Sequence, residues 1–361
     1  MDKKIKLLML VNYIPHYRIP VINKLGCNFD LTVAHYADRL IEDTDLKFKQ
    51  ILLTPKYFCG FLFYKENIFK LANNFDVVLS LSEIRVIPNM LLGFKKRNFG
   101  LVYWGIGVAA SYTKEFDSDN FFLKRIRMYL SSRADALIFY SDYPVKKYMN
   151  FGVSKERLFV ANNTVEVKDR VDTDNEKKHF IFVGTLYKQK RIYELLDAYV
   201  LYMASSSIVK PLVLVGDGDE MEPIKSWIIN NDLEKHIILK GSVFNQEELK
   251  FLYQDAIACI SPGQAGLTVL NSMAYGVPFV TSENAITGGE IFNIIHNETG
   301  IIYDGAIDSL CQNMKKLSED SIFLKRLSKN AQDFYFENRT IDIMVKGFLN
   351  AVHFASKIPN K

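Results

Sequence analysis

Short apolar runs alternate with helix-forming segments from residue 179 onward, and this alternation constrains the fold more than any other feature. The runs are continuously apolar, which is typical of strands buried on both faces of a sheet. Strands that alternate with helices along the chain form parallel sheets covered by helices. We therefore expect such a sheet, with strands at 179–183, 212–215, 237–239, 257–260, 277–281 and 300–303 and helices near 189–206, 219–230, 245–254, 266–275 and 305–318.

The first half of the chain repeats this pattern less regularly. Its strands are expected at 5–11, 30–35, 77–80, 101–104, 136–140 and 158–161, and an almost wholly polar stretch then separates the two halves. A chain of 361 residues is long enough for two domains. We predict a Rossmann-like N-terminal domain, a linker, a Rossmann-like C-terminal domain and a last helix that returns to the first domain, over residues 1–168, 169–178, 179–337 and 338–361.

Bulk properties exclude several classes of protein. A net charge of +4 is too small to indicate a nucleic-acid partner. The four cysteines are widely spread and form no Cys-x-x-Cys pair, so we expect reduced thiols. No uncharged apolar run approaches the roughly 18 residues that span a bilayer, and the first residues do not resemble a signal peptide. We expect a cytoplasmic protein.

A glycine-containing turn joins a strand to a helix within residues 257–281. The strand at 257–260 ends at Ser261-Pro262-Gly263, the helical pattern runs from Gly266 to Gly276, and another strand follows. Glycine lets a ligand approach the backbone closely, and a helix start offers free N–H groups and the positive end of the dipole. This combination suits a diphosphate bound beyond the carboxyl ends of the strands.

The same stretch resembles the nucleotide-sugar site of GT-B glycosyltransferases, in particular retaining enzymes of the family 4 type. The residues that match in order and spacing are Gly266, Leu267, Leu270, Met273, Ala274, Gly276 and Pro278. The resemblance implies an α/β GT-B fold, with two Rossmann-like domains whose parallel sheets face each other across a cleft. The two glutamates of the family pattern fall on Gly263, which has no side chain, and on Asn271, whose amide can still bind ribose hydroxyls.

Two further loops of the second half are similar to family segments. In Phe182–Arg191, Lys190 takes the position of a lysine that holds the donor diphosphate, while Thr185 takes that of an arginine. Arg191 or Lys188 could compensate for the lost cation, and the alternative is a solvated basic loop at a helix start.

The third loop, Val215–Glu220, resembles a turn near the nucleotide base. Its Asp217 and Asp219 raise the question of a metal, but such a pair more often caps a helix, and Asp219 is well placed to do so. We predict no metal and no cofactor. Glu290 falls where relatives often place a glutamate near the donor, and helix-dipole stabilisation is the alternative explanation.

Candidate acceptor residues lie in the first half. Asn12–Pro20 resembles a loop of the family in which a Pro-x-Tyr-Arg segment follows the first strand. His16 could act as an acid or base or could be an ordinary surface histidine, and Arg18 could bind an acceptor phosphate or form a structural ion pair. Trp104 and Gly105 end another strand near the expected donor sugar, and Ile106 stands where relatives often carry histidine.

A basic amphipathic pattern covers residues 121–133. Its apolar positions form one face and its cations the remainder, and the cluster Lys95-Lys96-Arg97 is flanked by aromatic residues. This arrangement fits a helix that lies on an anionic membrane, and equally a helix that packs on the core with solvated charges.

These observations predict a hexosyltransferase that uses a nucleoside-diphosphate sugar and a saccharide or lipid-linked saccharide acceptor, with retention, in bacterial surface-polysaccharide assembly. It would be cytoplasmic, or peripheral at the inner face of the plasma membrane. The alternatives are a nucleotide-sugar epimerase and a degenerate binding protein of the same fold. The predicted catalytic residues are Lys190, His16 and Glu290; the donor residues are Gly184, Thr185, Lys190, Arg191, Gly216, Gly218, Gly263, Gln264, Gly266, Leu267, Thr268 and Asn271; the acceptor residues are Asn12, His16, Tyr17, Arg18, Trp104 and Gly105.

Overall fold

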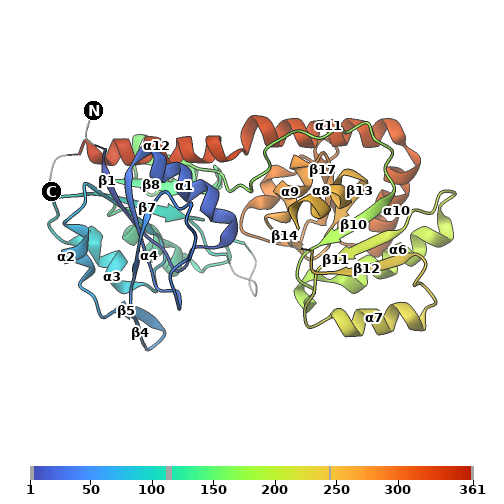
Figure 1. Ribbon diagram of the computed structural model, residues 1–361, viewed down its shortest axis with the longest axis horizontal. Helices are drawn as coiled ribbons and strands as arrows, with labels where there is room; N and C mark the ends of the chain where they lie inside the picture. The colour runs from blue at the N-terminus through green and yellow to red at the C-terminus, as the bar shows by residue number, and fades with distance from the viewer. Residues whose placement is uncertain (1–3, 111–115, 244, 359–361) are drawn as a thin grey trace. The chain divides into compact units, whose positions relative to one another are not determined.

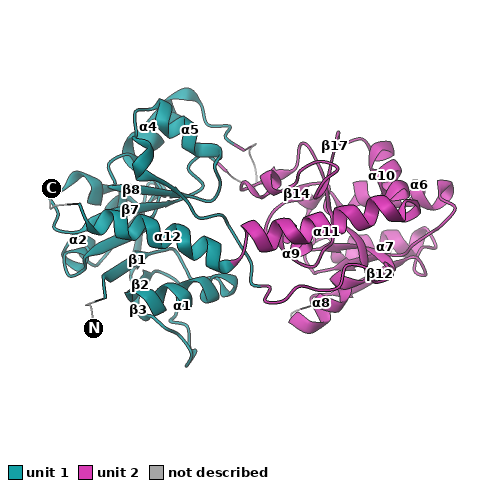
Figure 2. Ribbon diagram, turned by 90° about the horizontal axis from the view of Figure 1, so that it is seen from above, with its two compact units in different colours: residues 1–109, 117–166, 341–361 teal, residues 110–116, 167–340 magenta. Residues whose placement is uncertain are grey.

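The computed structural model describes all residues except 1–3, 111–115, 244 and 359–361, and it divides into two compact units (Figures 1 and 2). Unit 1 comprises residues 1–109, 117–166 and 341–361. Unit 2 comprises residues 167–340 together with the short stretch 110–116, of which only 110 and 116 are described. Each unit is built around one parallel sheet, so the expected α/β class with two Rossmann-like domains is confirmed.

The sheet of unit 1 has seven parallel strands in the order β3-β2-β1-β6-β7-β8-β9. Its central strands are mainly apolar and mostly buried, as a sheet covered on both faces requires. The strands are β1 (Lys6–Leu10), β2 (Asp30–His35), β3 (Lys49–Leu52), β6 (Val77–Leu81), β7 (Gly100–Gly105), β8 (Ala136–Phe139) and β9 (Leu158–Val160). The helices are η1 (His16–Arg18), α1 (Ile19–Asn28), α2 (Ile68–Ala72), α3 (Ile87–Leu91), η2 (Leu92–Phe94), α4 (Phe121–Ser131), α5 (Tyr143–Asn150), η3 (Lys155–Arg157) and α12 (Ile341–Ser356).

The last helix, α12, belongs to unit 1 although it follows unit 2 in the sequence (Figure 2). It packs on β7, β8, β9 and α1, and it buries Met344, Phe348 and Val352. The packing is close at Gly347, where an added Cβ would lie 2.3 Å from the carbonyl oxygen of Val160. The core of unit 1 is therefore completed by a segment from the far end of the chain.

Two strands of unit 1, β4 (Pro55–Phe58) and β5 (Phe61–Tyr64), form an antiparallel hairpin that the sequence pattern did not indicate. Its two turn residues, Cys59 and Gly60, have φ of +48° and +78°. Positive φ at both positions is the geometry of a type I′ turn, which matches the twist of the strands it joins. Figure 1 shows the hairpin projecting from unit 1 beside α3.

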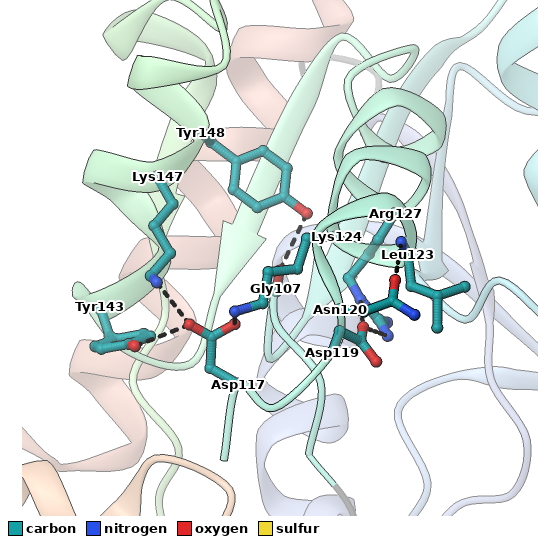
Figure 3. A network of polar contacts seen from close by, with 10 residues as sticks. All are labelled: Gly107, Asp117, Asp119, Asn120, Leu123, Lys124, Arg127, Tyr143, Lys147 and Tyr148. Carbon is teal, nitrogen blue, oxygen red and sulfur yellow. Dashed lines mark hydrogen bonds and ion pairs between the residues drawn. The ribbon is translucent and has the colours of Figure 1, made fainter. Parts of the chain in front are cut away.

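A network of polar contacts fixes α4 to α5 (Figure 3). The Asp117 carboxylate accepts hydrogen bonds from Lys147 Nζ at 2.6 Å and Tyr143 Oη at 3.0 Å, and it lies 3.3 Å from Lys124 Nζ. Burial would raise the pKa of Asp117, but these three donors outweigh it, so the pKa is lower than usual. The Asn120 side chain caps α4 by accepting from the N–H of Leu123.

The sheet of unit 2 has six parallel strands in the order β12-β11-β10-β13-β15-β17. These strands are β10 (His179–Val183), β11 (Leu212–Val215), β12 (Ile237–Gly241), β13 (Ala256–Ile260), β15 (Phe279–Ser282) and β17 (Gly300–Tyr303). The remaining elements are η4 (Lys188–Lys190), α6 (Ile192–Ser205), α7 (Met221–Asn230), α8 (Gln246–Gln254), β14 (Gln264–Ala265), α9 (Thr268–Ala274), β16 (Ile286–Thr287), η5 (Glu290–Asn293), α10 (Ile307–Glu319) and α11 (Ser321–Asn338). In the described part of the chain, no helix is long and apolar enough to cross a membrane.

Candidate functional site

Three loops meet at the carboxyl edge of the unit 2 sheet. Gly184, which follows β10, donates its N–H to Val215 O at 2.9 Å, and Leu186 N–H donates to Asp217 O at 2.9 Å. The loop after β13 joins them, because Gly263 N–H donates to Lys190 O at 3.1 Å. These backbone bonds bring together the three segments in which the sequence predicts donor residues.

Two glycines allow these loops to approach one another. Gly216 and Gly218 have φ of +141° and +154°, which other residues rarely adopt. A Cβ at Gly216 would lie 1.9 Å from the carbonyl oxygen of Gly184, and one at Gly218 would lie 2.4 Å from that of Leu186. Both glycines are therefore required by backbone packing, independently of any ligand.

The side chain of Lys190 is buried in η4, with only 7% of its surface exposed. Its Nζ lies 6.0 Å from the ring centre of Phe182 and 5.7 Å from that of Tyr187, and within the described residues it forms no hydrogen bond or ion pair. Burial lowers the pKa of Lys190 to about 8. Burial also raises the pKa of the nearby Cys259 thiol to about 12, so this neighbour is not an anion. Lys190 is a buried cation at a loop edge whose protein surroundings supply no counterion.

The Arg191 side chain, unlike that of Lys190, makes hydrogen bonds and an ion pair within unit 2. Its guanidinium donates to Pro262 O at 2.6 Å and to the Ser282 hydroxyl, and it pairs with Glu194 at 3.4 Å. These bonds tie η4 to the ends of β13 and β15. Arg191 thus supports the loop that carries Lys190, whereas the Thr185 and Lys188 side chains are exposed.

The start of α9 lies against the end of β10. Thr268 Oγ1 lies 3.5 Å from Val183 O, and the Gln264 side chain accepts a hydrogen bond from Tyr187 Oη. Gly266 and Leu267 precede the helix, and nothing within 4 Å would meet a Cβ at Gly266. The half-buried Asn271 amide makes no side-chain hydrogen bond within the described residues.

Gly263 leaves no room for the glutamate that the family pattern places there. A Cβ at this position would lie 2.1 Å from Gln189 O and 2.9 Å from Arg191 Cγ. The backbone of Gln189 and the side chain of Arg191 occupy the space that a side chain at position 263 would need. The absence of that carboxylate is therefore built into the loop packing.

Two acidic side chains of unit 2, Asp217 and Glu290, accept hydrogen bonds from nearby backbone N–H groups. Glu290 is 8% exposed in η5, next to α9, and accepts from the N–H of Gly288 at 3.1 Å. The predicted cap by Asp219 is wrong, because α7 starts after Glu220 without a side-chain cap and Asp217 instead accepts from the N–H of Gly218 at 2.7 Å. Among the described residues, no three His, Cys, Asp or Glu side chains are grouped as a metal site would need.

A separate cavity of about 130 Å³ lies within unit 1, beside the carboxyl end of β1. It includes four of the predicted acceptor residues, Asn12, Tyr17, Arg18 and Trp104. The Trp104 Nε1–H is buried and finds no hydrogen-bond acceptor among the described residues. The cavity therefore offers aromatic walls, which suit the apolar face of a hydroxylated ring.

Arg18 is a wall of this cavity and is 5% exposed. Its guanidinium carbon lies 5.4 Å from the ring centre of Trp104 and 5.2 Å from that of Tyr140, and it donates to Asn163 Oδ1 at 2.5 Å. Arg18 forms no ion pair with a described residue. The aromatic rings and the Asn163 hydrogen bond hold its guanidinium.

The two remaining acceptor candidates lie apart from this cavity lining. His16 is exposed in η1, and Gly105 ends β7. The sequence pattern gave no sign of Tyr140, which contacts Arg18. This residue directly follows β8, so the rule that sites lie at carboxyl ends of parallel strands could have found it.

Comparison with known proteins finds relatives for part of the chain. Residues 164–334 match the family described as glycosyl transferases group 1. N-acetyl-alpha-D-glucosaminyl L-malate synthase of Bacillus anthracis is 24% identical over 50% of this chain and 47% of its own length. The O-antigen chain mannosyltransferase RfbU of Salmonella typhimurium is 22% identical over 39% of this chain and 41% of its own. The match thus spans less than half the length of either curated relative.

The fold likeness extends over the whole chain. The structure of HepE from Anabaena in complex with UDP and glucose has a TM-score of 0.69 and 16% identity, and the match covers 97% of this chain and 99% of that one. The chain therefore has the GT-B fold of two Rossmann-like domains. Residues 164–334 are similar to the group 1 glycosyl transferases.

Proposed function

We propose that this protein transfers a hexosyl group from a nucleoside-diphosphate sugar to a saccharide or lipid-linked saccharide, with retention of the anomeric configuration. The observation that carries the proposal is the buried Lys190 ammonium, which has no counterion among the described residues at the edge where three loops meet. A donor diphosphate would supply the missing anion. Because negative charge grows on the leaving diphosphate as the glycosidic bond breaks, Lys190 would stabilise the transition state more than the bound donor.

The rest of the proposed donor site follows from the same edge. Backbone N–H groups near Gly266–Thr268, at the start of α9, would bind the diphosphate oxygens, and Asn271 would bind ribose hydroxyls. The departing phosphate can itself help to deprotonate the acceptor hydroxyl. We assign Glu290 and His16 to the proposed catalytic surroundings, and the cavity of Asn12, Tyr17, Arg18 and Trp104 to the acceptor.

Relatives guide the choice of probe. HepE was crystallised with UDP, so UDP is the first diphosphate to test. Calorimetry should detect UDP binding to the wild type, and Lys190→Met should weaken it at least tenfold. Lys188→Met is the matched control, because Lys188 lies on the same short helix with an exposed side chain. Equal affinity of all three proteins would remove Lys190 from the donor site.

Product analysis separates the candidate functions. Incubation with a nucleotide sugar and no acceptor, followed by NMR, would show glycosyl release by a transferase or an altered sugar from an epimerase. Binding without any product would indicate a degenerate binding protein, the alternative raised by Gly263 and Asn271. We also propose that transfer needs no metal, so the rate should be unchanged after chelation by EDTA.

We further propose that the protein acts in bacterial surface-polysaccharide assembly, in the cytoplasm or peripherally at the inner face of the plasma membrane. The O-antigen chain mannosyltransferase among its relatives supports this setting. So does α4, in which Ser131 is the buried residue while Phe121 and Phe122 are each 73% exposed. An amphipathic helix with unburied apolar residues and cations suits an anionic membrane surface. Co-sedimentation with anionic and with neutral vesicles tests the membrane association.

A further inference from the structure

The tip of the β4–β5 hairpin carries a cluster of exposed aromatic side chains. Tyr57 and Phe58 are 72% and 70% exposed, and Phe61 is 44% exposed. Phe58 pairs directly with Phe61 across the strands, and the I′ turn of Cys59 and Gly60 closes the hairpin beyond them. Large apolar side chains that project from a rigid tip are costly to leave in water and mark an interaction site.

Two elements, α3 and η2, connect the hairpin to α4 through packing contacts. Leu62 of β5 bridges to Val86, and β5 packs on α3. Helix α3 leads directly into η2, whose Phe94 ring lies 5.9 Å from the ring of Tyr129 in α4. The Asp117 carboxylate lies against Lys124 of α4 and Lys147 of α5 (Figure 3). Phe121 and Phe122 of α4 remain exposed. We call the surface formed by the hairpin tip, η2 and α4 the aromatic face of unit 1.

Exposed cations gather on this face. Residues 55–65 contain two lysines and no acid, and α4 contains basic residues and no acid. Within the described residues, none of the exposed cations Lys56, Lys65, Lys95, Lys96, Arg125 and Arg133 pairs with a carboxylate. Arg133 instead lies over the rings of Phe94 and Tyr129, at 5.2 and 5.9 Å from their centres. Cations and aromatic rings therefore share one surface.

We infer that the aromatic face docks on a lipid bilayer containing anionic lipid, with the β4–β5 tip inserted as its apolar anchor. This inference rests on the proposed membrane association and names the element that enters the lipid. The rings of Phe58 and Phe61 can enter the acyl boundary, while Tyr57 and the lysines stay at the headgroups. A folded protein partner would need a pocket shaped for this tip, whereas a bilayer accepts it without matched geometry.

The chain supplies a natural reporter of insertion, because Cys59 is exposed in the turn. In a Cys27→Ser variant, Cys59 is labelled with an environment-sensitive fluorophore and mixed with phosphatidylcholine–phosphatidylglycerol vesicles. We expect a blue shift and quenching by lipids brominated in their acyl chains. The control carries the label on Cys27, the other exposed cysteine, in a Cys59→Ser variant, and should show neither change.

A second measurement needs no label. The triple variant Tyr57→Ser, Phe58→Ser, Phe61→Ser should bind the same vesicles at least tenfold more weakly than wild type. Replacing Lys95 and Lys96 by Gln should cost about fivefold each, as expected for lysines near an anionic surface. An unchanged melting temperature verifies that the variants fold.

The outcomes separate this inference from the proposals it rests on. If wild type binds anionic vesicles, but the Cys59 label stays in water and the triple variant binds normally, the hairpin is not the anchor and the inference is overturned. If wild type binds no vesicles, the inference and the membrane association both fail. Glycosyl transfer to an acceptor in solution is measured independently of either result.

Discussion

Replacing Lys190 with methionine should stabilise unit 2 and weaken diphosphate binding at the same time. The lysine stem lies beside the rings of Phe182 and Tyr187, and methionine can fill this apolar space without a charge. The Lys190 ammonium is buried away from water and has no carboxylate partner among the described residues. Its replacement therefore removes an unfavourable contribution to the free energy of folding. If Lys190 serves binding and not stability, its loss should raise the stability of the protein and lower its affinity for the ligand.

The lowered pKa of Lys190 sets the expected gain in the free energy of unfolding for Lys190→Met. Burial lowers it from 10.5 to about 8, and each pH unit corresponds to about 1.4 kcal/mol, so charging the buried lysine costs about 3 kcal/mol. At pH 7 the lysine is charged in both folded and unfolded chains, and the full penalty applies. Between pH 8 and 10.5 the folded protein holds a neutral lysine while the unfolded chain still binds the proton, so wild type regains stability as pH rises. The advantage of Lys190→Met, up to about 3 kcal/mol at pH 7, should vanish near pH 10.5.

The assay can follow unit 2 separately, since the two tryptophans lie in different units, Trp104 in unit 1 and Trp227 in unit 2. In a Trp104→Phe background, urea unfolding is monitored by Trp227 fluorescence at pH 7 and pH 10, with and without UDP. Lys188→Met should change stability by less than about 0.5 kcal/mol. The reasoning is refuted if Lys190→Met is no more stable than wild type at pH 7, or if it is stabilised and still binds UDP normally.

Three other changes test separate features of the structure. Asn271→Ala should raise the dissociation constant for the donor about tenfold, near 1.4 kcal/mol, and calorimetry showing wild-type affinity would make Asn271 an ordinary helix residue. Gly263→Glu should fail to improve donor binding and should destabilise unit 2 by about 2 kcal/mol or more, because even its Cβ would lie 2.1 Å from Gln189 O; a stable variant with tighter binding would contradict this. Asp117→Asn should lower the stability of unit 1 by about 1–2 kcal/mol at pH 7, as measured by Trp104 fluorescence in a Trp227→Phe background. Since the pKa of Asp117 is depressed, the difference should disappear as pH falls through that pKa, and a difference that persists in acid would show that the carboxylate charge is not responsible.

Strands of unit 2 could be predicted because strands buried on both faces consist mainly of apolar residues. Phe180, Ile181 and Phe182 are all fully buried, so β10 reads as an uninterrupted apolar run. In unit 1, β3 escaped the pattern because it lies at the sheet edge and its residues are half-buried or exposed. The hairpin was not predicted because its turn, Cys59-Gly60, is not one of the common two-residue hairpin sequences, and most residues of its strands are half-buried or exposed.

For the site, the sequence identified the loops better than the roles of individual side chains. Glycines that follow strands indicated which loops would meet at the carboxyl edge of the sheet. In the structure, backbone hydrogen bonds of Gly184 and Gly263 join these loops. Sequence spacing could not distinguish Lys190 from its neighbour Arg191, because the difference depends on which tertiary partners each meets. Arg191 meets Pro262 O and Ser282, whereas Lys190 meets aromatic rings.

The return of α12 to unit 1 has a consequence for the order in which the protein matures on the ribosome. Met344 and Phe348 are synthesised after the whole of unit 2, so the sheet of unit 1 lacks its covering helix until unit 2 has been made. The Arg18 guanidinium also donates to the sulfur of Met344 at 3.2 Å. The cavity that Arg18 lines is thus complete only after α12 has been made, later than every loop of the unit 2 edge.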